Sequence, residues 1–271
     1  MRLLFIGDIV GKPGREILCH ALPALVSAQR LDLIVANAEN AAAGSGYTPK
    51  IHAELMAAGV DAITLGDHVY RRREVLPLLE SESNIAVPAN HPDEATGRRW
   101  VSVVARNGEL AMVTCALGQL FMRPIDSPWR AIDRVLAEAP SEILVRLVDF
   151  HAEATSEMQV MGRYLDGRVS AVVGTHTHVP TADERVLPSG TAFQCDVGMT
   201  GPHESIIGRR IDRVLAATLT GMPHPFDVAD GDVRINGAVI ETDPQTGLAV
   251  SIERLMVTEL EAARLASSKG Q

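Results

Sequence analysis

A chain of 271 residues with 46% hydrophobic residues is long enough to bury a sizeable core without disulfides or a partner. Its 25 basic and 34 acidic residues give a formal net charge of -9. The surface as a whole therefore repels polyanions such as nucleic acids. Any phosphate that this protein handles must therefore be attracted locally. No stretch approaches the roughly 18 consecutive apolar residues of a membrane span, so we expect no membrane partner.

The three cysteines, Cys19, Cys115 and Cys195, lie far apart and form no CxxC pair. This spacing fits neither a disulfide framework nor a zinc knuckle. The apolar stretch over residues 3–6 is too short for the core of a signal peptide. We therefore expect a soluble protein in the reducing cytoplasm.

Short runs of aliphatic and β-branched residues alternate with helix-like stretches through the first two thirds of the chain. The runs cover residues 3–6, 33–36, 62–65, 85–87, 110–114, 143–149 and 171–173. Apolar residues at helical spacing predict helices over residues 14–29 and 49–58, and Gly59 ends the second. This alternation predicts an α/β fold.

Beyond about residue 185 the helical signal fades, and short strands with turns replace it. Candidate strands cover residues 191–194, 233–242 and 248–257, and Asn236-Gly237 and Thr246-Gly247 have the composition of hairpin turns. No repeat, low-complexity linker or long charge run divides the chain. We therefore expect one domain over residues 1–271, with two sheets stacked face to face, helices outside, and a frayed end over residues 262–271.

Side chains that can bind metal ions follow directly after five of the predicted strands. In chain order they are Asp8, Glu39, Asn40, Asp67, His68, His151, His176 and His178. Ligands of open α/β sheets bind at this edge of the strands. A mixture of carboxylate, amide and imidazole groups suits manganese, iron or zinc better than the all-oxygen cage of calcium. The pattern predicts a metal centre, in which two ions about 3.5–4 Å apart could deliver a hydroxide to phosphorus.

Each of these residues also has a structural interpretation. Asp8 could be a turn residue, Glu39 with Asn40 could cap a helix, and a lone His151 is more often a satisfied polar group than a ligand. His176 and His178 favour ligation, because two positions apart in an extended segment place both imidazoles on one side. The shared position at one sheet edge favours the metal centre.

Two other catalytic motifs do not fit. Residues 7–14 look like a phosphate-binding loop, but Ile6 stands where its first glycine belongs and Pro13 where a serine or threonine belongs. An aspartyl-phosphatase nucleophile at Asp8 would need a second aspartate at position 10, which is occupied by Val10. We therefore give neither motif weight in the assignment of function.

The blocks around these residues resemble those of calcineurin-like metallophosphoesterases, and in particular those of the bacterial YmdB family. The resemblance is carried by residues 7–11, 38–42, 66–68, 149–157, 174–183 and 196–202, so it spans nearly the whole chain. It implies a four-layer α/β/β/α sandwich of the metallo-dependent phosphatase type. It also implies phosphodiesterase activity on 2',3'-cyclic nucleotides.

The resemblance further implies a role for each residue. One ion would take Asp8, Glu39, Asn40 and His178. The other would share Glu39 and add Asp67, His151 and His176. His68 would donate a proton to the leaving group. Iron is the expected metal, with manganese or zinc as alternatives.

Two positions depart from the superfamily pattern. Val10 stands where a histidine usually follows the first aspartate, and Asn40 supplies the missing ligand, as in the YmdB group. Asp67 stands where the family usually has asparagine. Its carboxylate can still bind a metal, but the added negative charge should hold the ions more tightly while opposing an anionic substrate.

We therefore predict a binuclear metallophosphoesterase that hydrolyses a small phosphodiester or cyclic nucleotide by in-line attack of a hydroxide that bridges two ions. Two alternatives stay open. One is a metal-binding regulatory or scaffold protein with little turnover, and the other is a phosphomonoesterase with the same site. We expect no stable binding of duplex nucleic acid, whereas exposed segments of the β-rich tail could support a homo-oligomer.

Overall fold

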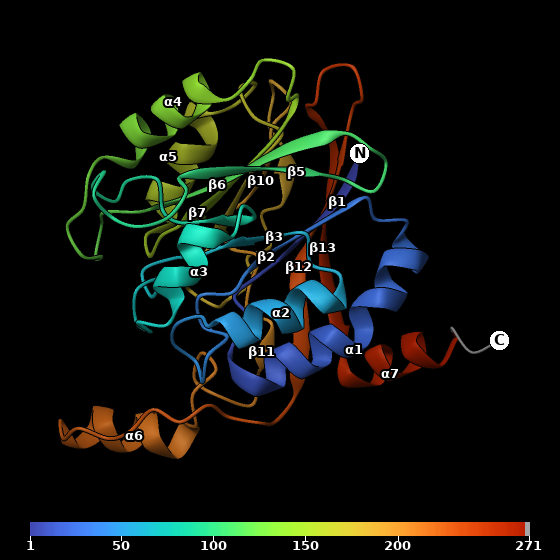
Figure 1. The fold of residues 1–271 in the computed structure, drawn as a ribbon. Helices are drawn as coiled ribbons and strands as arrows, with labels where there is room; N and C mark the ends of the chain where they lie inside the picture. The colour runs from blue at the N-terminus through green and yellow to red at the C-terminus, as the bar shows by residue number, and fades with distance from the viewer. Residues whose placement is uncertain (269–271) are drawn as a thin grey trace.

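The computed structural model describes residues 1–268, and its strands form two sheets that lie face to face (Figure 1). The first sheet contains β11 (Gly201–Pro202), β12 (Val233–Thr242), β1 (Arg2–Ile6), β2 (Leu33–Asn37), β3 (Ala62–Thr64) and β4 (Ile85–Ala86) in that spatial order, with β13 (Ala249–Thr258) paired to β12. The second contains β5 (Trp100–Val104), β6 (Leu110–Leu117), β7 (Val145–His151), β8 (Ala171–Thr175), β10 (Ala192–Gln194) and β9 (Arg185–Val186) in order.

Helices cover the outer face of each sheet. The first sheet packs against α1 (Gly11–Gln29), α2 (Pro49–Ala58), α3 (Val75–Ser81) and α7 (Glu259–Ser268). The second packs against α4 (Pro128–Glu138) and α5 (Thr155–Tyr164). The predicted four-layer α/β/β/α sandwich is therefore confirmed. No helix among residues 1–268 combines the length and the apolar character that a membrane crossing needs.

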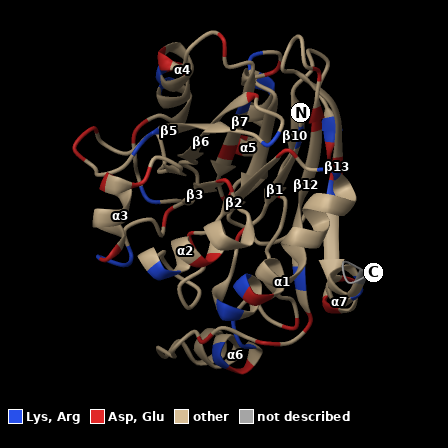
Figure 2. Ribbon diagram, turned by 45° about the vertical axis from the view of Figure 1, so that its right-hand side comes forward, with Lys and Arg blue, Asp and Glu red and all other residues tan. Residues whose placement is uncertain are grey.

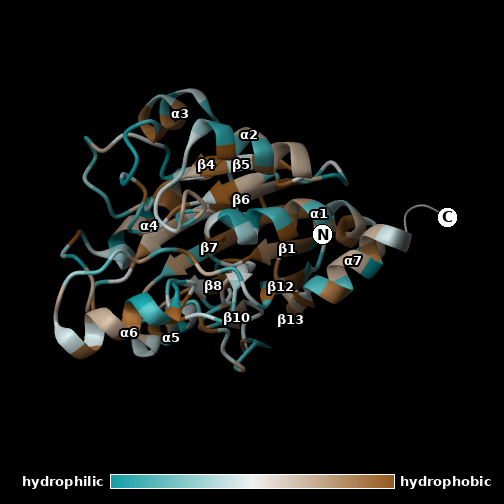
Figure 3. Cartoon of the chain, turned by 90° about the horizontal axis from the view of Figure 1, so that it is seen from below, coloured by the Kyte–Doolittle hydropathy of each residue, from teal (hydrophilic) through white to brown (hydrophobic). Residues whose placement is uncertain are grey.

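The alternation of side chains along β1 shows how the layers are joined. Leu3 and Phe5 are buried between the two sheets, whereas Leu4 and Ile6 are buried against the helices. A strand that is covered on both faces needs apolar residues at successive positions, which is the composition of this run. Figure 3 shows the same concentration of hydrophobic residues on the strands between the helical layers.

Parallel pairing brings the carboxyl ends of the central strands to one edge. In the first sheet β1 pairs with β2 and β2 with β3, all parallel. In the second sheet β6 pairs with β7 and β7 with β8, also parallel. Because parallel strands end at the same side of a sheet, the loops that follow β1, β2, β3, β7 and β8 meet there. These loops carry the predicted site residues.

Two expectations for the C-terminal third are wrong, and one is confirmed. Thr246-Gly247 lies between β12 and β13 as predicted, but Asn236-Gly237 lies inside β12 rather than in a turn. Gly237 is needed there because a Cβ would meet the backbone carbonyl of Phe5 on the neighbouring strand. The expected frayed end begins instead as helix: residues 262–268 belong to α7 and Ala262 is buried, while residues 269–271 lie outside the described part.

The sequence analysis also missed β5 and the helix α6 (Ile211–Thr220). In Figure 1 α6 stands clear of the sandwich. None of its residues is buried, and Leu215 and Leu219 are exposed. A helix without a buried face has no core-facing apolar stripe, so the sequence did not distinguish α6 from the β-rich tail that we expected.

Candidate metal centre

All eight predicted site residues lie in one connected set of contacts at the carboxyl edge of the strands. Asp8 follows β1, Glu39 and Asn40 follow β2, Asp67 and His68 follow β3, His151 ends β7, and His176 and His178 follow β8. The backbone ties these loops together, since Ile9 N donates to Asn37 O at 3.0 Å and Gly11 N donates to Asn40 O at 3.0 Å.

One half of the centre is formed by Glu39, Asp67, His151 and His176. Their ligand atoms all lie within 4.8 Å of one another. His151 Nε2 lies 3.2 Å from Glu39 Oε1, 3.3 Å from Asp67 Oδ1 and 3.0 Å from His176 Nδ1. Two carboxylates and two imidazoles therefore point at one small volume, as the resemblance implied for one of the two ions.

The other half is formed by Asp8, Asn40 and His178, and it meets the first half at Glu39. Asn40 Nδ2 lies 3.4 Å from Asp8 Oδ1, 3.1 Å from Glu39 Oε1 and 3.2 Å from His178 Nε2. Asp8 Oδ1 lies 3.7 Å from His178 Nε2. Glu39 Oε1 thus contacts both halves, which is the position of a shared ligand.

The amide of Asn40 has its nitrogen toward this group and its oxygen 2.8 Å from His68 Nδ1. Ligation of a cation requires the oxygen. A half-turn of the amide exchanges the two atoms without changing the shape of the side chain. That half-turn would direct Oδ1 toward Asp8 and His178 and Nδ2 toward His68, so Asn40 has the right position and one rotation to make.

Hydrogen bonds on the outer nitrogen of His151 fix the state of its ring. Nδ1 lies 2.8 Å from Thr175 Oγ1, and the Thr175 hydroxyl donates to Asp149 Oδ1 at 2.7 Å. Because the hydroxyl proton is committed to Asp149, Thr175 accepts from Nδ1–H. In the neutral ring Nε2 then carries the lone pair, and it is Nε2 that faces Glu39 and Asp67, whose charges raise the pKa of His151 against the effect of burial.

The other two histidines are held in the same manner. His176 Nε2 lies 3.2 Å from Glu153 Oε2, which is an acceptor. His178 Nδ1 lies 3.0 Å from the carbonyl oxygen of Ile207. With Nδ1 of His178 beside this carbonyl and Nε2 of His176 facing the Glu153 carboxylate, the inner nitrogens of the neutral rings keep the lone pairs that a metal ion needs.

Both histidines after β8 have left-handed backbone conformations, with φ of 103° at His176 and 65° at His178. This conformation is uncommon for residues other than glycine and is stored where the surroundings enforce it. Asp8 Oδ2 accepts from His176 N at 3.1 Å, and Asp196 Oδ2 accepts from Thr177 N at 3.0 Å and from its hydroxyl at 2.8 Å. Burial raises the pKa of Asp196 to about 8, with the charge of Asp8 adding to the effect.

The donor set fits a cation. Asp8 and Glu39 are fully buried, and among residues 1–268 no lysine or arginine forms an ion pair with either of them, or with Asp67. Buried carboxylates without a positive partner are costly. Burial alone would raise the pKa of Glu39, but the positive charge of a protonated His151 lowers it, so the carboxylate stays charged; a bound cation would take the place of that proton. The cluster therefore suits metal ions.

The sequence analysis missed the residues that orient the histidines. Thr175 and Asp149 lie in buried strands and read as core, while Glu153 lies two positions after His151 in a block used only for the resemblance. Gly66 was also missed, although a Cβ there would meet Glu39 Oε2 and lie 2.5 Å from His151 Nε2. A glycine directly before a candidate ligand was the available signal.

Removing the carboxylate of Glu153 should weaken the centre without disturbing the fold. In Glu153→Ala, His176 Nε2 loses its acceptor, and the ring is free to turn or to change its protonated nitrogen. Losses of this kind typically lower metal affinity by about 10–100-fold. Competition with a coloured chelator measures the affinity, and Glu142→Ala, which removes another exposed carboxylate, is the matched control. Equal affinities in the two variants would contradict the role of Glu153.

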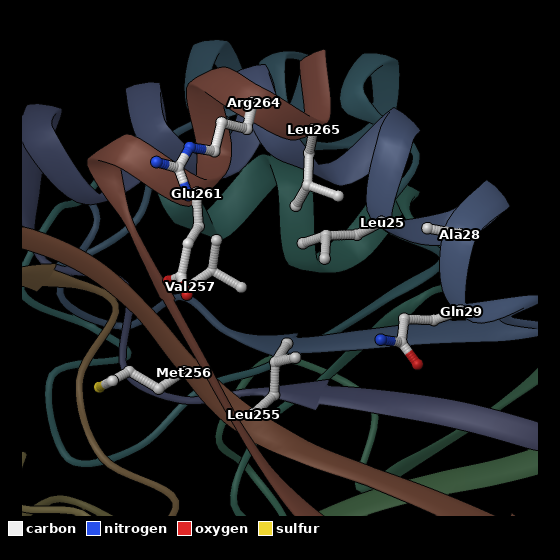
Figure 4. A pocket seen from close by; sticks show the side chains of 9 residues that line it. All are labelled: Leu25, Ala28, Gln29, Leu255, Met256, Val257, Glu261, Arg264 and Leu265. Carbon is white, nitrogen blue, oxygen red and sulfur yellow. The ribbon is translucent and has the colours of Figure 1, made fainter. Parts of the chain in front are cut away.

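A separate hollow lies between α1, β13 and α7 (Figure 4). Leu25, Leu255 and Val257 line it, and Glu261 and Arg264 lie at its border. None of the predicted site residues lines it. The candidate metal centre is therefore not part of this apolar hollow.

The model of the YmdB-like protein family matches residues 4–255 of this chain. The chain belongs to the YmdB-like family. It is 43% identical over 259 residues to a Bacillus subtilis (strain 168) protein named 2',3'-cyclic-nucleotide 2'-phosphodiesterase, which covers 96% of this chain and 98% of that protein. The family resemblance seen in the sequence is confirmed.

Two solved structures extend the comparison. A phosphatase from Mycoplasma pneumoniae is 30% identical, has a TM-score of 0.89, and is matched over 95% of this chain and 93% of that chain. The calcineurin-like phosphoesterase YfkN from Bacillus subtilis is 11% identical with a TM-score of 0.51, covering 100% of this chain and 96% of that chain, and it shows the fold alone. These similarities confirm the prediction that this protein is a hydrolase.

Proposed function

We propose that this protein is a metal-dependent phosphodiesterase that hydrolyses small phosphodiesters, with 2',3'-cyclic nucleotides as its substrates. The observation that carries the proposal is the convergence of inward-facing lone pairs. His151, His176 and His178 each have the outer nitrogen within 3.2 Å of an acceptor oxygen and the inner nitrogen turned toward the carboxylates of the centre. The name of the Bacillus subtilis relative supports the substrate class.

We assign one ion to Asp8, Glu39, Asn40 and His178, and the second to Glu39, Asp67, His151 and His176. Iron is the metal that we favour, with manganese or zinc as alternatives, since all accept oxygen and imidazole ligands together. When bound, such ions would lower the pKa of the attacking water and withdraw charge from the phosphoryl oxygens. The free cysteines agree with a reducing compartment, and we infer a cytoplasmic enzyme.

His68 is the residue that we assign to protonation of the leaving group. Its backbone N donates to Glu39 Oε2 at 2.9 Å, and its Nδ1 is 2.8 Å from Asn40 Oδ1. The ring is therefore held by two neighbours of the centre, while its side chain remains 25% exposed. Nε2, which lies 3.9 Å from Asp67 Oδ2, is the nitrogen left to face a substrate. With the Asn40 amide turned as ligation requires, its Nδ2 donates to His68 Nδ1, so the proton of the neutral ring lies on Nε2 and can pass to a departing oxygen.

Asp67 favours a diester over a monoester. Its carboxylate is 31% exposed at the border of the centre, where it faces an incoming phosphate. A phosphate monoester carries up to about two negative charges near neutral pH. A diester carries one, so the repulsion by Asp67 is smaller. The smaller repulsion of a diester by Asp67 favours a phosphodiesterase over a phosphomonoesterase with the same ligands.

We expect the metal-loaded protein to hydrolyse a 2',3'-cyclic nucleotide at least about tenfold faster, by kcat/KM, than the 3'-monophosphate of the same nucleoside. The physical reason is the single charge of the diester, and about 1.4 kcal/mol of differential repulsion is enough for a factor of ten. Steady-state assays on one preparation with both substrates provide the measurement. A preference for the monoester would favour the phosphomonoesterase, and no turnover of either substrate would favour a regulatory or scaffold role.

A further inference from the structure

A cluster of cations lies beside the metal centre of a chain whose net charge is -9. Arg71, Arg72 and Arg73 are exposed and follow His68 by three to five residues. Lys50, in the first turn of α2, is exposed and lines the same hollow as Arg72. These four residues form what we call the basic rim. In Figure 2 the blue stretch that leads into α3 lies close to the blue first turn of α2.

The cations of the basic rim have few partners in the protein. Within residues 1–268, the side chains of Lys50, Arg71 and Arg73 form no hydrogen bond or ion pair, and none of the four pairs with a carboxylate. Arg72 Nε donates only to the carbonyl oxygen of Ser45, at 3.4 Å. Surface arginines usually reach a carboxylate when one is near. These four are free to bind an anion from outside.

Nearby carboxylates do not cancel this charge. In the same hollow Arg15 Nε pairs with Glu54 at 3.0 Å, and beside it Lys12 pairs with Glu16 at 3.4 Å. These pairs neutralise one another. Glu74 is the remaining acid that lines the hollow, so Lys50 and Arg72 face one unpaired carboxylate there.

Two short connections join the basic rim to the metal centre. Arg71 N donates to His68 O at 3.0 Å, and Gly46 N donates to Glu39 O at 2.5 Å. A Cβ on Gly46 would come within 2.6 Å of Arg72 Cγ, so the aliphatic stem of this arginine packs on the loop that follows Glu39. Three residues span at most about 11 Å, which keeps Arg71 close to His68.

We propose that the basic rim binds the phosphodiester backbone of a single-stranded oligoribonucleotide whose 3' end, closed as a 2',3'-cyclic phosphate, lies at the metal centre. This inference rests on the proposed function and names its substrate class, an RNA end rather than a free mononucleotide. A cyclic mononucleotide has one phosphate, which the metal centre occupies, and it leaves four free cations without a role. Upstream phosphates of an oligonucleotide supply the missing anions.

The chemistry of the rim favours this occupant over an acidic protein segment. Arginine guanidinium groups match phosphate oxygens in a bidentate geometry. The rim is continuous with a site proposed to bind a phosphodiester, so a second phosphate of the same strand reaches it without a separate binding event. A duplex is disfavoured because the rest of the surface carries the excess of negative charge.

The first arm of the test measures binding. A fluorescein-labelled hexaribonucleotide with a 3'-phosphate, which the site does not consume as a cyclic diester, is titrated with metal-loaded protein at several salt concentrations. The double variant Arg71→Gln/Arg73→Gln is compared with the wild type. Each phosphate contact on a single strand contributes about 0.7 to the slope of log K against log salt, so the slope should fall by about 1.4. The control, Arg30→Gln/Arg264→Gln, removes two exposed arginines that form no ion pair in the described part, one directly after α1 and one in α7, and should keep the slope.

The second arm measures specificity. The ratio of kcat/KM for a hexaribonucleotide with a 2',3'-cyclic end to that for the cyclic mononucleotide should be at least about ten in the wild type at low salt. In Arg71→Gln/Arg73→Gln this ratio should approach one, and in the control it should stay at the wild-type value. Thermal unfolding of each variant checks that the exposed substitutions leave the fold intact.

Several outcomes overturn the inference. A ratio near one in the wild type does so while leaving the proposed function standing, because the mononucleotide is then still hydrolysed. An unchanged salt slope in the double variant also overturns it. Displacement of the labelled hexamer by inorganic phosphate or polyglutamate, at the same concentration at which unlabelled hexamer displaces it, also overturns the inference. The rim would then bind single anions or acidic peptides. Failure of the metal-loaded protein to hydrolyse either substrate overturns the proposed function and, with it, this substrate class.

Discussion

His68→Ala should lower turnover of a 2',3'-cyclic nucleotide by about 10²–10⁴-fold while leaving the metal content unchanged. The ribose oxygen that leaves is a poor leaving group and needs a proton, and His68 Nε2 is the ring nitrogen that faces the site. A diester with a phenolate leaving group needs little protonation, so its hydrolysis should fall much less. Steady-state rates with both substrates and elemental analysis of the same samples provide the measurement.

The control for this experiment is His20→Ala, which removes an exposed histidine of α1. It should retain the wild-type rates. Equal losses on the two substrates would indicate that His68 supports the ligands rather than the leaving group, because its ring contacts Asn40 and its backbone contacts Glu39. Full activity of His68→Ala on the cyclic nucleotide would contradict the assignment outright.

Glu39→Ala should abolish binding of metal at both positions and reduce hydrolysis by on the order of 10⁴-fold or more, since the charge-withdrawing groups of the site depend on it. Glu39 Oε1 contacts His151 Nε2 at 3.2 Å and Asn40 Nδ2 at 3.1 Å, so it belongs to both halves of the centre. Elemental analysis counts the ions, and the cyclic-nucleotide assay gives the rate.

The isosteric variant Glu39→Gln separates charge from packing. It keeps the volume of the buried side chain but removes its negative charge, and we expect it to lose metal almost as completely as Glu39→Ala. Retention of two ions per chain in Glu39→Gln would show that the shared carboxylate is not required. Glu142→Ala removes an exposed carboxylate that follows α4 in the sequence, and it should behave as the wild type.

The strand ends located the site because parallel pairing fixes where the strands of a sheet end. Once the apolar runs are identified as parallel strands, Asp8, Glu39 and Asp67 must meet at one edge of the first sheet and His151 and His176 at one edge of the second, whatever the details of the loops, and the stacking of the sheets brings the two edges together. The sandwich follows from the same runs, which are apolar at successive positions because each sheet is covered on both faces.

The residues that set the chemistry of the ligands could not be found in the same way. Thr175 and the Ile207 carbonyl act through hydrogen bonds to ring nitrogens and Glu153 through an ion-pair contact, and such contacts depend on side-chain orientation. Ile207 is 29 positions from His178 and contributes only a backbone atom, which no composition or spacing reveals. Orientation of this kind requires coordinates.

The C-terminal third was predicted least well, and the reasons are specific. Gly237 has the composition of a turn but serves a close approach between β12 and β1, which is a tertiary constraint. α6 has no buried face, so the spacing of core residues along the sequence did not indicate a helix there. At Gly237 a tertiary contact outweighs the local sequence preference. At α6 the lack of tertiary contacts has the same consequence for the prediction.

The charge at position 67 has consequences for both proposals. Asp67 adds a carboxylate to a centre that already holds Asp8 and Glu39, and the neighbouring imidazoles, against the effect of burial, lower its pKa well below the ordinary value. A permanently charged ligand binds cations more tightly and repels substrate anions. The basic rim lies close enough to compensate for that repulsion with a longer substrate.

The central claim is that seven of the eight clustered residues bind two metal ions on which hydrolysis depends, with His68 as the proton donor beside them. Titration of metal-free protein with iron, and in parallel with manganese and zinc, tests it most directly when bound metal and hydrolysis of a 2',3'-cyclic nucleotide are measured at each point. We expect saturation at two ions per chain, with activity absent at the start and complete at saturation. Full activity in protein freed of metal, or saturation without any hydrolysis, would contradict the account.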